Sequence, residues 1–405
     1  MARADVTIPR RAVAWLAPGE SGALSVITGL IVIGVIFQSL NGRFLSPVNL
    51  TNLLVQGAVF MLLGMSEVFA LLLGDIDLSV GFVSAIGGVI TAELLIGSRD
   101  WPWWAAVIVA LLVTTAIGAL QGTLIARLRL PSFVVTLAGL LACQGVMIWI
   151  LGPGGTLPIS DNVINDLANG CLTPAASWLV MAAIVAAFAV VTIRRDAERR
   201  VGGAPGGAAG PPVSRTAAKV GGAAAVGLAV VVVCDTNRGV LSPVRGVPWV
   251  VLIVLGVLFA WSFLLNRTRF GRDAHAIGSN AEAARRAGVS LASIRTVSFA
   301  LAGLTAGVGG IIYASQLRSV SSGTDGATLV LYAVAAAVIG GTSLFGGRGK
   351  PLDGVLGGIV IAAIYNGIYL LGMSAAAQDL IFALVLLAAV SADVLARRGQ
   401  ASRRA

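Results

Sequence analysis

Charged side chains are scarce in this chain of 405 residues. Asp, Glu, Lys and Arg make up 11% of the sequence, against about 25% in soluble domains, while apolar residues make up 57%. A water-soluble fold could not cover its surface with so few charges. The composition therefore excludes the two or three soluble domains that the length alone would allow, and it favours an all-α bundle of membrane-spanning helices.

Residues that carry common enzyme and metal chemistry are equally scarce. The single histidine, His275, gives no material for a catalytic triad or a histidine zinc site. The three cysteines, Cys143, Cys171 and Cys234, show neither the spacing of metal ligands nor a disulfide framework. We therefore expect no enzymatic activity, no metal ion and no cofactor bound by this chain.

A phosphate-binding loop is also missing. Such a loop reads Gly-x4-Gly-Lys followed by Ser or Thr. Lys350 comes closest, but Pro351 follows it and Leu344 stands where the first glycine should be; Lys219 fails as well. If ATP drives this protein, ATP and magnesium must bind to a separate ATPase subunit.

Long apolar runs are abundant instead. A spanning helix needs about 20 predominantly apolar residues, and twelve candidate segments follow one another in a single membrane domain over 1–405. They are Gly22–Leu40, Leu50–Leu73, Leu78–Ile96, Trp103–Ile125, Phe133–Leu151, Ala175–Ile193, Val220–Val233, Val247–Leu265, Ile294–Ala314, Ala327–Gly340, Leu352–Leu371 and Ala376–Leu395. We interpret the first as a retained helix and not as a cleaved signal.

The basic residues set the predicted orientation. Cytoplasmic loops of membrane proteins are rich in Lys and Arg. If both termini are cytoplasmic, the loops on the outer side keep five of the 28 basic residues, namely Arg43, Arg99, Arg238, Arg245 and Arg318. The other 23 then lie on the cytoplasmic side. This asymmetry favours twelve spans with both ends in the cytoplasm.

Two of the cytoplasmic segments are long. The first, 194–219, contains the run GGAPGGAAGPP, and we interpret it as a flexible linker. The second, 266–295, contains GSNAEAARRAGVS, which is typical of a short capped helix. Asn280 suits the N-cap, Glu282 falls in the first turn, and Gly288 can close the end in the left-handed conformation. Two helical turns are not stable alone, so this helix must dock on something.

This short helix resembles a known element. Glu282, Ala283 and Ala284, followed four residues later by Gly288, are similar to the coupling helix of binding-protein-dependent ATP-driven importers. In that family the helix is seated in a cleft of the ATPase. The resemblance implies that the ATPase contacts of this chain include Asn280, Glu282, Ala283, Ala284, Arg285 and Gly288.

Five further blocks occur in order along the chain: Phe44–Leu50, Gly74–Gly81, Pro131–Leu137, Ala276–Asn280 and Gly340–Gly349. Together they resemble the conserved segments of the ribose/xylose-type sugar permeases. The resemblance covers about 44–151 and 269–395. It implies the permease subunit of an ABC importer in the bacterial inner membrane. Its implied partners are an ATPase, a periplasmic or lipid-anchored sugar-binding protein, a second permease copy and membrane lipid.

The chain departs from that family pattern in two places. Asp75 replaces the second glycine of a Gly-Gly-Ile-Asp-Leu-Ser-Val-Gly signature, which adds an acid where backbone freedom is expected. Extra apolar length around 175–250 turns the usual ten spans into about twelve. Xylose-type members are longer in a similar way, so xylose or another pentose is the first expectation for the substrate.

Polar residues within or beside the apolar runs are candidates for the translocation pathway or its gate. The segment Gly74–Gly81 has two interpretations that stay open: a pathway wall at a broken helix, or a structural turn in which Asp77 and Ser79 cap the next span. Most polar residues inside spans only bond to neighbouring helices. The candidates are Gln56, Glu67, Asp75, Asp77, Ser79, Gln144 and Asn366.

An ion-coupled secondary transporter of small polar solutes is the alternative function. The acids Glu67, Asp75 and Asp77 support it, because such carriers need ionisable groups in the membrane. The capped loop helix argues against it, since that helix has no role in such carriers. Neighbouring genes for an ATPase and a binding protein would decide between the two.

Overall fold

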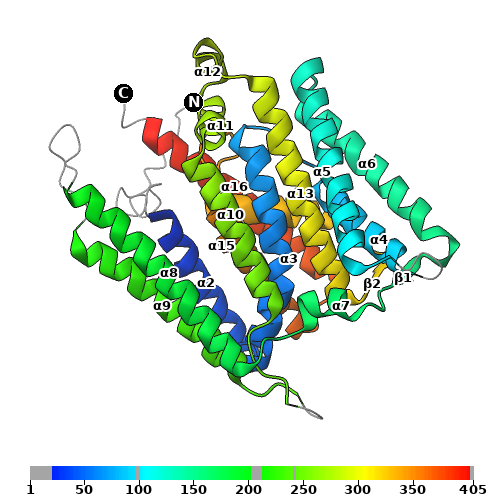
Figure 1. The fold of residues 1–405 in the computed structure, drawn as a ribbon, viewed down its shortest axis with the longest axis vertical. Coiled ribbons are helices and arrows are strands. Elements are labelled where there is room, and N and C mark those ends of the chain that lie inside the picture. The colour runs from blue at the N-terminus through cyan, green and yellow to red at the C-terminus, as the bar shows by residue number, and fades with distance from the viewer. Residues whose placement is uncertain (1–20, 97–100, 202–211, 240–242, 402–405) are drawn as a thin grey trace, which may run out of the picture. The chain divides into compact units, whose positions relative to one another are not determined.

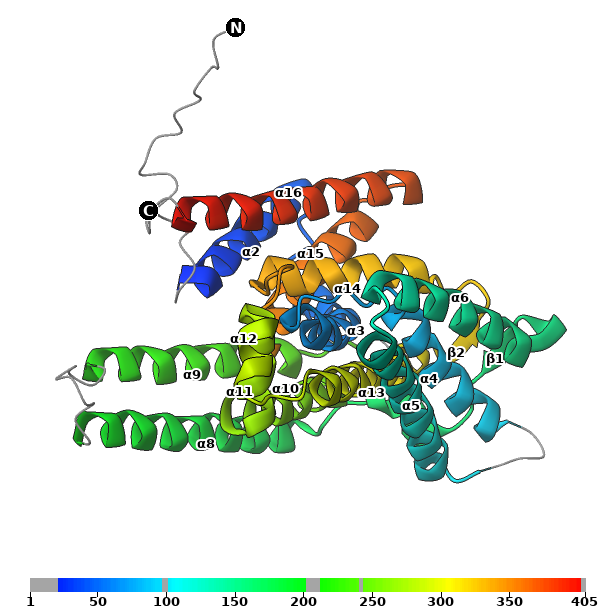
Figure 2. The same cartoon turned by 90° about the horizontal axis from the view of Figure 1, so that it is seen from above.

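The computed structural model describes residues 21–96, 101–201, 212–239 and 243–401, most of which are helical (Figures 1 and 2). The helices are α2 (Ser21–Leu40), α3 (Pro47–Leu72), α4 (Val80–Leu95), α5 (Trp103–Leu128), α6 (Ser132–Leu151), η2 (Gly152–Gly154), α7 (Asn162–Asn169), α8 (Pro174–Val201), α9 (Val213–Asp235), α10 (Trp249–Arg267), α11 (Arg269–Ser279), α12 (Ala281–Arg286), α13 (Leu291–Leu317), α14 (Gly326–Gly340), α15 (Pro351–Leu370) and α16 (Ala375–Ala401). Two short strands, β1 (Thr156–Pro158) and β2 (Ser319–Ser321), accompany them.

All twelve predicted apolar segments coincide with helices, which confirms the helical class. Within the described residues, eight helices are long and apolar enough to cross a membrane, and four further apolar stretches are shorter. Among the short ones, α4 has 16 residues and α14 has 15. At 1.5 Å per residue they reach about 22–24 Å, less than the roughly 30 Å of the hydrocarbon core. The number of spans and the side of the termini stay predictions.

The chain forms two compact units. One comprises residues 1–45, 53–169 and 250–405, and the other comprises 46–52 and 170–249. In the first unit α3 is buried along most of its length, with Leu62, Leu63 and Met65 fully enclosed. A helix that is apolar on all sides is expected in such a place.

Helices α5 and α13 make the most extensive contact of the first unit (Figure 2). Glycines allow this close approach. A Cβ atom on Gly118 would lie 2.1 Å from the backbone oxygen of Phe299, and one on Gly303 would lie 2.3 Å from that of Thr114. Small residues at helix contacts are the usual solution in membranes, where lipid gives helices no hydrophobic reason to associate.

The connection between α6 and α8 is more structured than the sequence indicates. Strand β1 pairs antiparallel with β2, and helix α7 follows. The Oγ of Ser315 on α13 accepts a hydrogen bond of 3.0 Å from the backbone N–H of Ala168 and donates one of 3.1 Å to the backbone oxygen of Asn165. These bonds fix α7 to the end of α13.

Helices α8 and α9 lie side by side in the second unit (Figure 1). The buried Asp196 accepts a hydrogen bond of 2.7 Å from Thr216, which joins the two helices near their connection. Both helices extend into the ends of the predicted linker, because α8 continues to Val201 and α9 begins at Val213. Alanine, arginine and glutamate are good helix formers, which explains the extension of α8 beyond its apolar run. The centre of that linker, 202–211, lies outside the described residues.

Candidate functional site

Helix α12 has the two ends that the sequence predicts. The Asn280 side chain accepts a hydrogen bond of 2.9 Å from the Ala283 N–H, which caps the first turn. Gly288 has a φ of +84°, so it closes the helix in the left-handed region that favours glycine. The backbone N–H of Val289 returns to the Ala284 oxygen. The cap predictions are therefore confirmed, and the ATPase contact stays a prediction.

The predicted coupling residues divide into an anchor and an exposed surface. Ala284 is buried and packs in a cluster with Leu265 and Ile277. The side chains of Glu282 and Arg285 are 51% and 65% exposed, and Ala283 is exposed as well. One helix face thus fixes α12 to its own unit, while the opposite face is free for another protein.

The exposed surface of α12 carries a fixed charge pattern. The carboxylate of Glu282 accepts hydrogen bonds from Arg285 at 2.9 Å and from Arg286 at 3.1 Å. These bonds, that of Arg285 first, lower the pKa of Glu282 below its ordinary value. The carboxylate therefore stays ionised through the physiological pH range, and the three side chains together present one net positive charge.

A second helix, α11, precedes α12, and the sequence interpretation missed it. The Thr268 side chain caps it by accepting from the Gly271 N–H, and its own residues Ala274 and Ile277 are buried. A Thr cap before residues of helical spacing was the signal that could have found it. Helix α11 matters because its buried residues Ala274 and Ile277 pack in the same cluster as Ala284 of α12.

Four of the five family-like blocks meet around the end of α3. A Cβ atom on Gly278 of α11 would lie 1.9 Å from the Leu72 oxygen and 2.4 Å from the Gly347 nitrogen. The Gly347 N–H donates a hydrogen bond of 2.9 Å to the same Leu72 oxygen. Backbones of three distant segments therefore touch directly. We call this contact of Leu72, Gly278 and Gly347 the glycine junction.

A buried polar cluster lies next along the chain, between α3 and α4. The Asp77 N–H donates to Glu67 at 3.2 Å, and the Asp77 carboxylate accepts from the Ser79 N–H at 2.8 Å and the Ser79 hydroxyl at 2.6 Å. That hydroxyl also lies 3.0 Å from Gln121 Oε1 on α5. Thr136 on α6 approaches the Ile76 oxygen at 3.3 Å, which adds the block at 131–137 to the same place.

The cluster supports parts of both interpretations of Gly74–Gly81. The chain is non-helical between α3 and α4, as a broken helix requires. Ser79 occupies the N-cap position of α4 but makes no capping hydrogen bond; its hydroxyl bonds to Asp77. Two buried atoms, Glu67 Oε2 and Gln121 Nε2, have no hydrogen-bond partner among the described residues.

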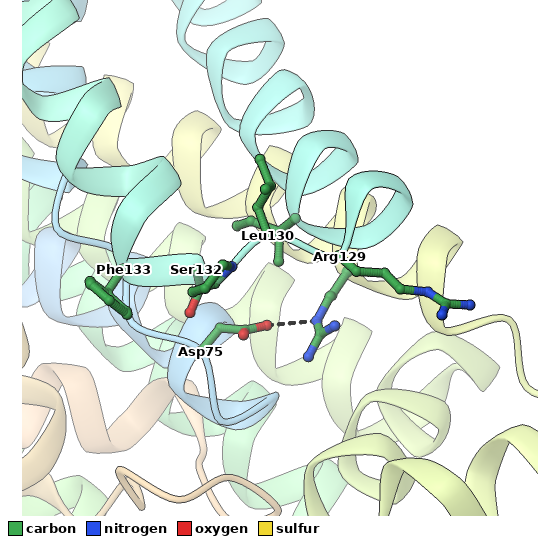
Figure 3. Close-up of a pocket in the computed structure, with 8 residues that line it drawn as sticks. Asp75, Arg129, Leu130, Ser132 and Phe133 are labelled. Carbon is green, nitrogen blue, oxygen red and sulfur yellow. Dashed lines mark hydrogen bonds and ion pairs between the residues drawn. The ribbon is translucent and has the colours of Figure 1, made fainter.

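Asp75 forms an ion pair that the sequence did not reveal. Its Oδ2 lies 2.8 Å from Nε of Arg295, in the first turns of α13. The pair borders a pocket of about 350 Å³ whose other lining residues include Arg129 and Phe133 (Figure 3). Figure 3 shows the Arg129 side chain extending away from the pair. The acid that departs from the family pattern therefore connects the α3–α4 segment to the first turns of α13.

The remaining pathway candidates lie elsewhere in the first unit. Asn366 on α15 donates a hydrogen bond of 3.4 Å to Gln56 on α3; Asn366 is buried and Gln56 is half-buried. Gln144 is half-buried on α6 and takes no part in the hydrogen bonds of the polar cluster. The structure thus brings Glu67, Asp77 and Ser79 together and leaves the other candidates separate from them.

A family described as branched-chain amino acid transport system / permease component matches residues 49–390. The xylose transport system permease protein of Escherichia coli K12 is 32% identical over 92% of this chain and 92% of its own length. The D-allose transport system permease protein of the same organism is 29% identical, covering 90% of each chain. The ribose import permease protein of Haemophilus influenzae is 28% identical, again with 90% of each chain covered.

No solved structure matches the chain. The family match extends over most of the sequence and includes the loop that carries α12, the glycine junction and the polar cluster. Eight apolar helices of spanning length agree with it. The chain belongs to this family of ABC-transporter permeases and is a multi-pass protein of the inner membrane.

Proposed function

We propose that this chain is the membrane-spanning subunit of an ATP-driven importer that carries a monosaccharide into the cytoplasm. The observation that carries the proposal is helix α12, which is packed against its own unit through Ala284 and exposed on its other face. The relatives of the chain are named as sugar permeases. The family match speaks against the ion-coupled carrier. Asp75, one of the acids that favoured that alternative, is neutralised by Arg295.

A pentose, with xylose first, is the proposed cargo. Two xylose permeases, from Escherichia coli and Haemophilus influenzae, are 32% and 30% identical to the chain. Helices α8 and α9 occupy the region of extra apolar length that suggested the xylose type. Allose and ribose permeases are nearly as similar, which supports a neutral sugar as the class.

The proposed topology has twelve spans and two cytoplasmic termini. It places α11, α12 and the Asp75–Arg295 pair on the cytoplasmic side. The ATPase would then meet Glu282, Ala283 and Arg285, while Ala284 holds α12 to the permease. ATP and magnesium would bind to that partner, in line with the missing phosphate loop.

The other proposed partners follow from the importer architecture. A periplasmic or lipid-anchored binding protein would deliver the sugar to the outer side, and a second copy of the chain would complete the pathway. Membrane lipid surrounds the apolar faces of α8 and α9, where Leu179 and Val226 are 72% and 66% exposed. Amide side chains suit the hydroxyl groups of a sugar, so Gln56, Gln144 and Asn366 are the preferred pathway residues.

Reconstitution tests the proposal directly. The chain, the neighbouring ATPase and the binding protein would be assembled in proteoliposomes and given radiolabelled xylose, ribose, allose and leucine. We expect uptake of a sugar that requires both ATP and the binding protein. Uptake of leucine alone, or uptake that a sodium or proton gradient drives without ATP, would overturn the proposal.

A further inference from the structure

Two of the three cysteines lie beside one arginine in the second unit. Arg238 Nη2 is 3.4 Å from the sulfur of Cys171, and Arg238 Nη1 is 3.4 Å from the hydroxyl of Thr51. That hydroxyl is 3.8 Å from the sulfur of Cys234. Arg238 also donates to the backbone oxygen of Cys234. The two thiols, 63 positions apart in the sequence, thus belong to one hydrogen-bonded group.

Backbone contacts hold both cysteines against one short segment. Cys171 forms an antiparallel bridge with Pro248. The Gly246 N–H donates a hydrogen bond of 2.8 Å to the Cys234 oxygen. Gly246 itself has a φ of +104°, and a Cβ atom there would lie 1.9 Å from the Leu172 oxygen. Both cysteines therefore contact the short segment Gly246–Pro248 through their backbones.

We propose that Cys171 and Cys234 form a disulfide bond on the outer side of the membrane. The location rests on the proposed topology, in which the ends of α7 and α9 face outward. That side is an oxidising compartment, where disulfides form and persist. Half-buried Cys171 is the more accessible thiol, while Cys234 is buried.

The reaction needs an oxidant, which we assign to the class of disulfide-carrying thiol oxidases. The Cys171 thiolate attacks the disulfide of that protein and releases one of its two thiols. The Cys234 thiolate then breaks the mixed disulfide and releases the second. Two protein thiols are oxidised, one disulfide is reduced to a dithiol, and the two protons pass to the reduced oxidant.

The remaining cysteine supplies an internal control. Cys143 is buried on α6 in the first unit, and the proposed topology places it within the membrane. It should stay a free thiol whatever happens to the other two.

Thiol counting in membranes tests the proposal. Membranes with the assembled transporter would be quenched in acid, denatured and treated with a polyethylene-glycol maleimide, with and without prior reduction. We expect one reactive thiol without reduction and three with it, and for Cys143→Ser none and two. Cys171→Ser should leave Cys234 reactive without reduction. Peptide mapping should find the linked pair.

Three reactive thiols before reduction would overturn the proposal. Sugar uptake measured on the same membranes keeps the two proposals apart: uptake with free thiols overturns only the disulfide, whereas a disulfide without uptake of any sugar overturns only the function. After reduction, an impermeant maleimide added to intact spheroplasts should reach Cys171. Labelling only from the cytoplasmic side would overturn the topology and, with it, the disulfide.

Discussion

Arg295 Nε lies 2.8 Å from Asp75 Oδ2, although 220 positions separate the two residues. Asp75 lies in the non-helical segment after α3, and Arg295 lies in the first turns of α13, the helix that follows α12. The Asp75 side chain is 9% exposed and that of Arg295 is 28% exposed, so water screens the pair only in part. The pair is therefore a direct electrostatic connection between the α3–α4 segment and the first turns of α13.

Breaking this pair should weaken coupling. Asp75→Asn and Arg295→Gln each leave one charged partner partly buried without its counterion, which costs about 1–3 kcal/mol in the conformation shown. We expect each variant to keep ATP hydrolysis but to lose most sugar uptake. The double variant should recover part of the uptake, because no unpaired charge remains. Arg129→Gln, in the same pocket, is the matched control and should transport normally. Additive losses in the double variant would show that the pair does not act as a unit.

The exposed face of α12 gives a second prediction. Glu282→Lys reverses a charge at the proposed ATPase contact, and Gly288→Val places a β-branched residue at positive φ, at about 1–2 kcal/mol. Both should insert normally and lose uptake, and the ATPase should no longer co-purify. Because the pKa of Glu282 is lowered, the wild-type contact should persist as pH falls from 8 to 5. A carboxyl group whose pKa is lowered by its contacts stabilises them above its ordinary pKa, and this stabilisation is lost only when the pH falls below that value.

A charge reversal elsewhere controls for this result. Glu198 is exposed near the end of α8, which the proposed topology also places on the cytoplasmic side. Glu198→Lys should leave transport and ATPase binding unchanged. If Glu282→Lys behaves like this control, α12 is not the coupling helix.

The glycine junction should tolerate no side chain. Gly278→Ala would bring a methyl group to 1.9 Å from the Leu72 oxygen, so α11 would have to shift away from α3. We expect a lower melting temperature and loss of uptake. Gly221→Ala on α9 is the matched control, because no atom lies within 4 Å of the added methyl group. That change should raise helix stability by about 0.5–1 kcal/mol. Equal thermal stability of the two variants would contradict the close contact.

Glu67 is predicted to act as a hydrogen-bond acceptor at the broken helix. Glu67→Gln keeps an oxygen for the Asp77 N–H, whereas Glu67→Leu removes it and leaves a buried donor unpaired, at about 1–3 kcal/mol. We therefore expect the glutamine variant to fold and transport, and the leucine variant to lose thermal stability in detergent. If both lose uptake while their stability is unchanged, Glu67 is needed as an acid, and the cluster has a role in the pathway itself.

The positions of the apolar helices and the ends of α12 could be predicted from the sequence. The twelve apolar runs identified the helices, and Asn280 and Gly288 gave both ends of α12, because caps depend on a few neighbouring residues. Helix α11 was missed because its apolar positions are sparse. The pairing of Asp75 with Arg295 joins residues 220 positions apart, and Arg238 contacts both Cys171 and Cys234, which are 63 positions apart. A single sequence holds no signal for such contacts. Likewise, Ala283 and Ala284 look equivalent in sequence, and only the packing shows that Ala284 is buried against its own unit while Ala283 is exposed.

The glycine junction also determines how motion would pass through this subunit. Side chains change rotamers easily, so a contact between two side chains can adjust and pass on only part of a displacement. At Leu72, Gly278 and Gly347 the backbones themselves are in contact, and a hydrogen bond of 2.9 Å joins Gly347 to Leu72. Because backbone atoms in contact yield less than side chains do, we expect a displacement of α11 toward α3 to be passed on to α3. The size of the movement that reaches α3 would then be set mainly by how far the partner displaces α12.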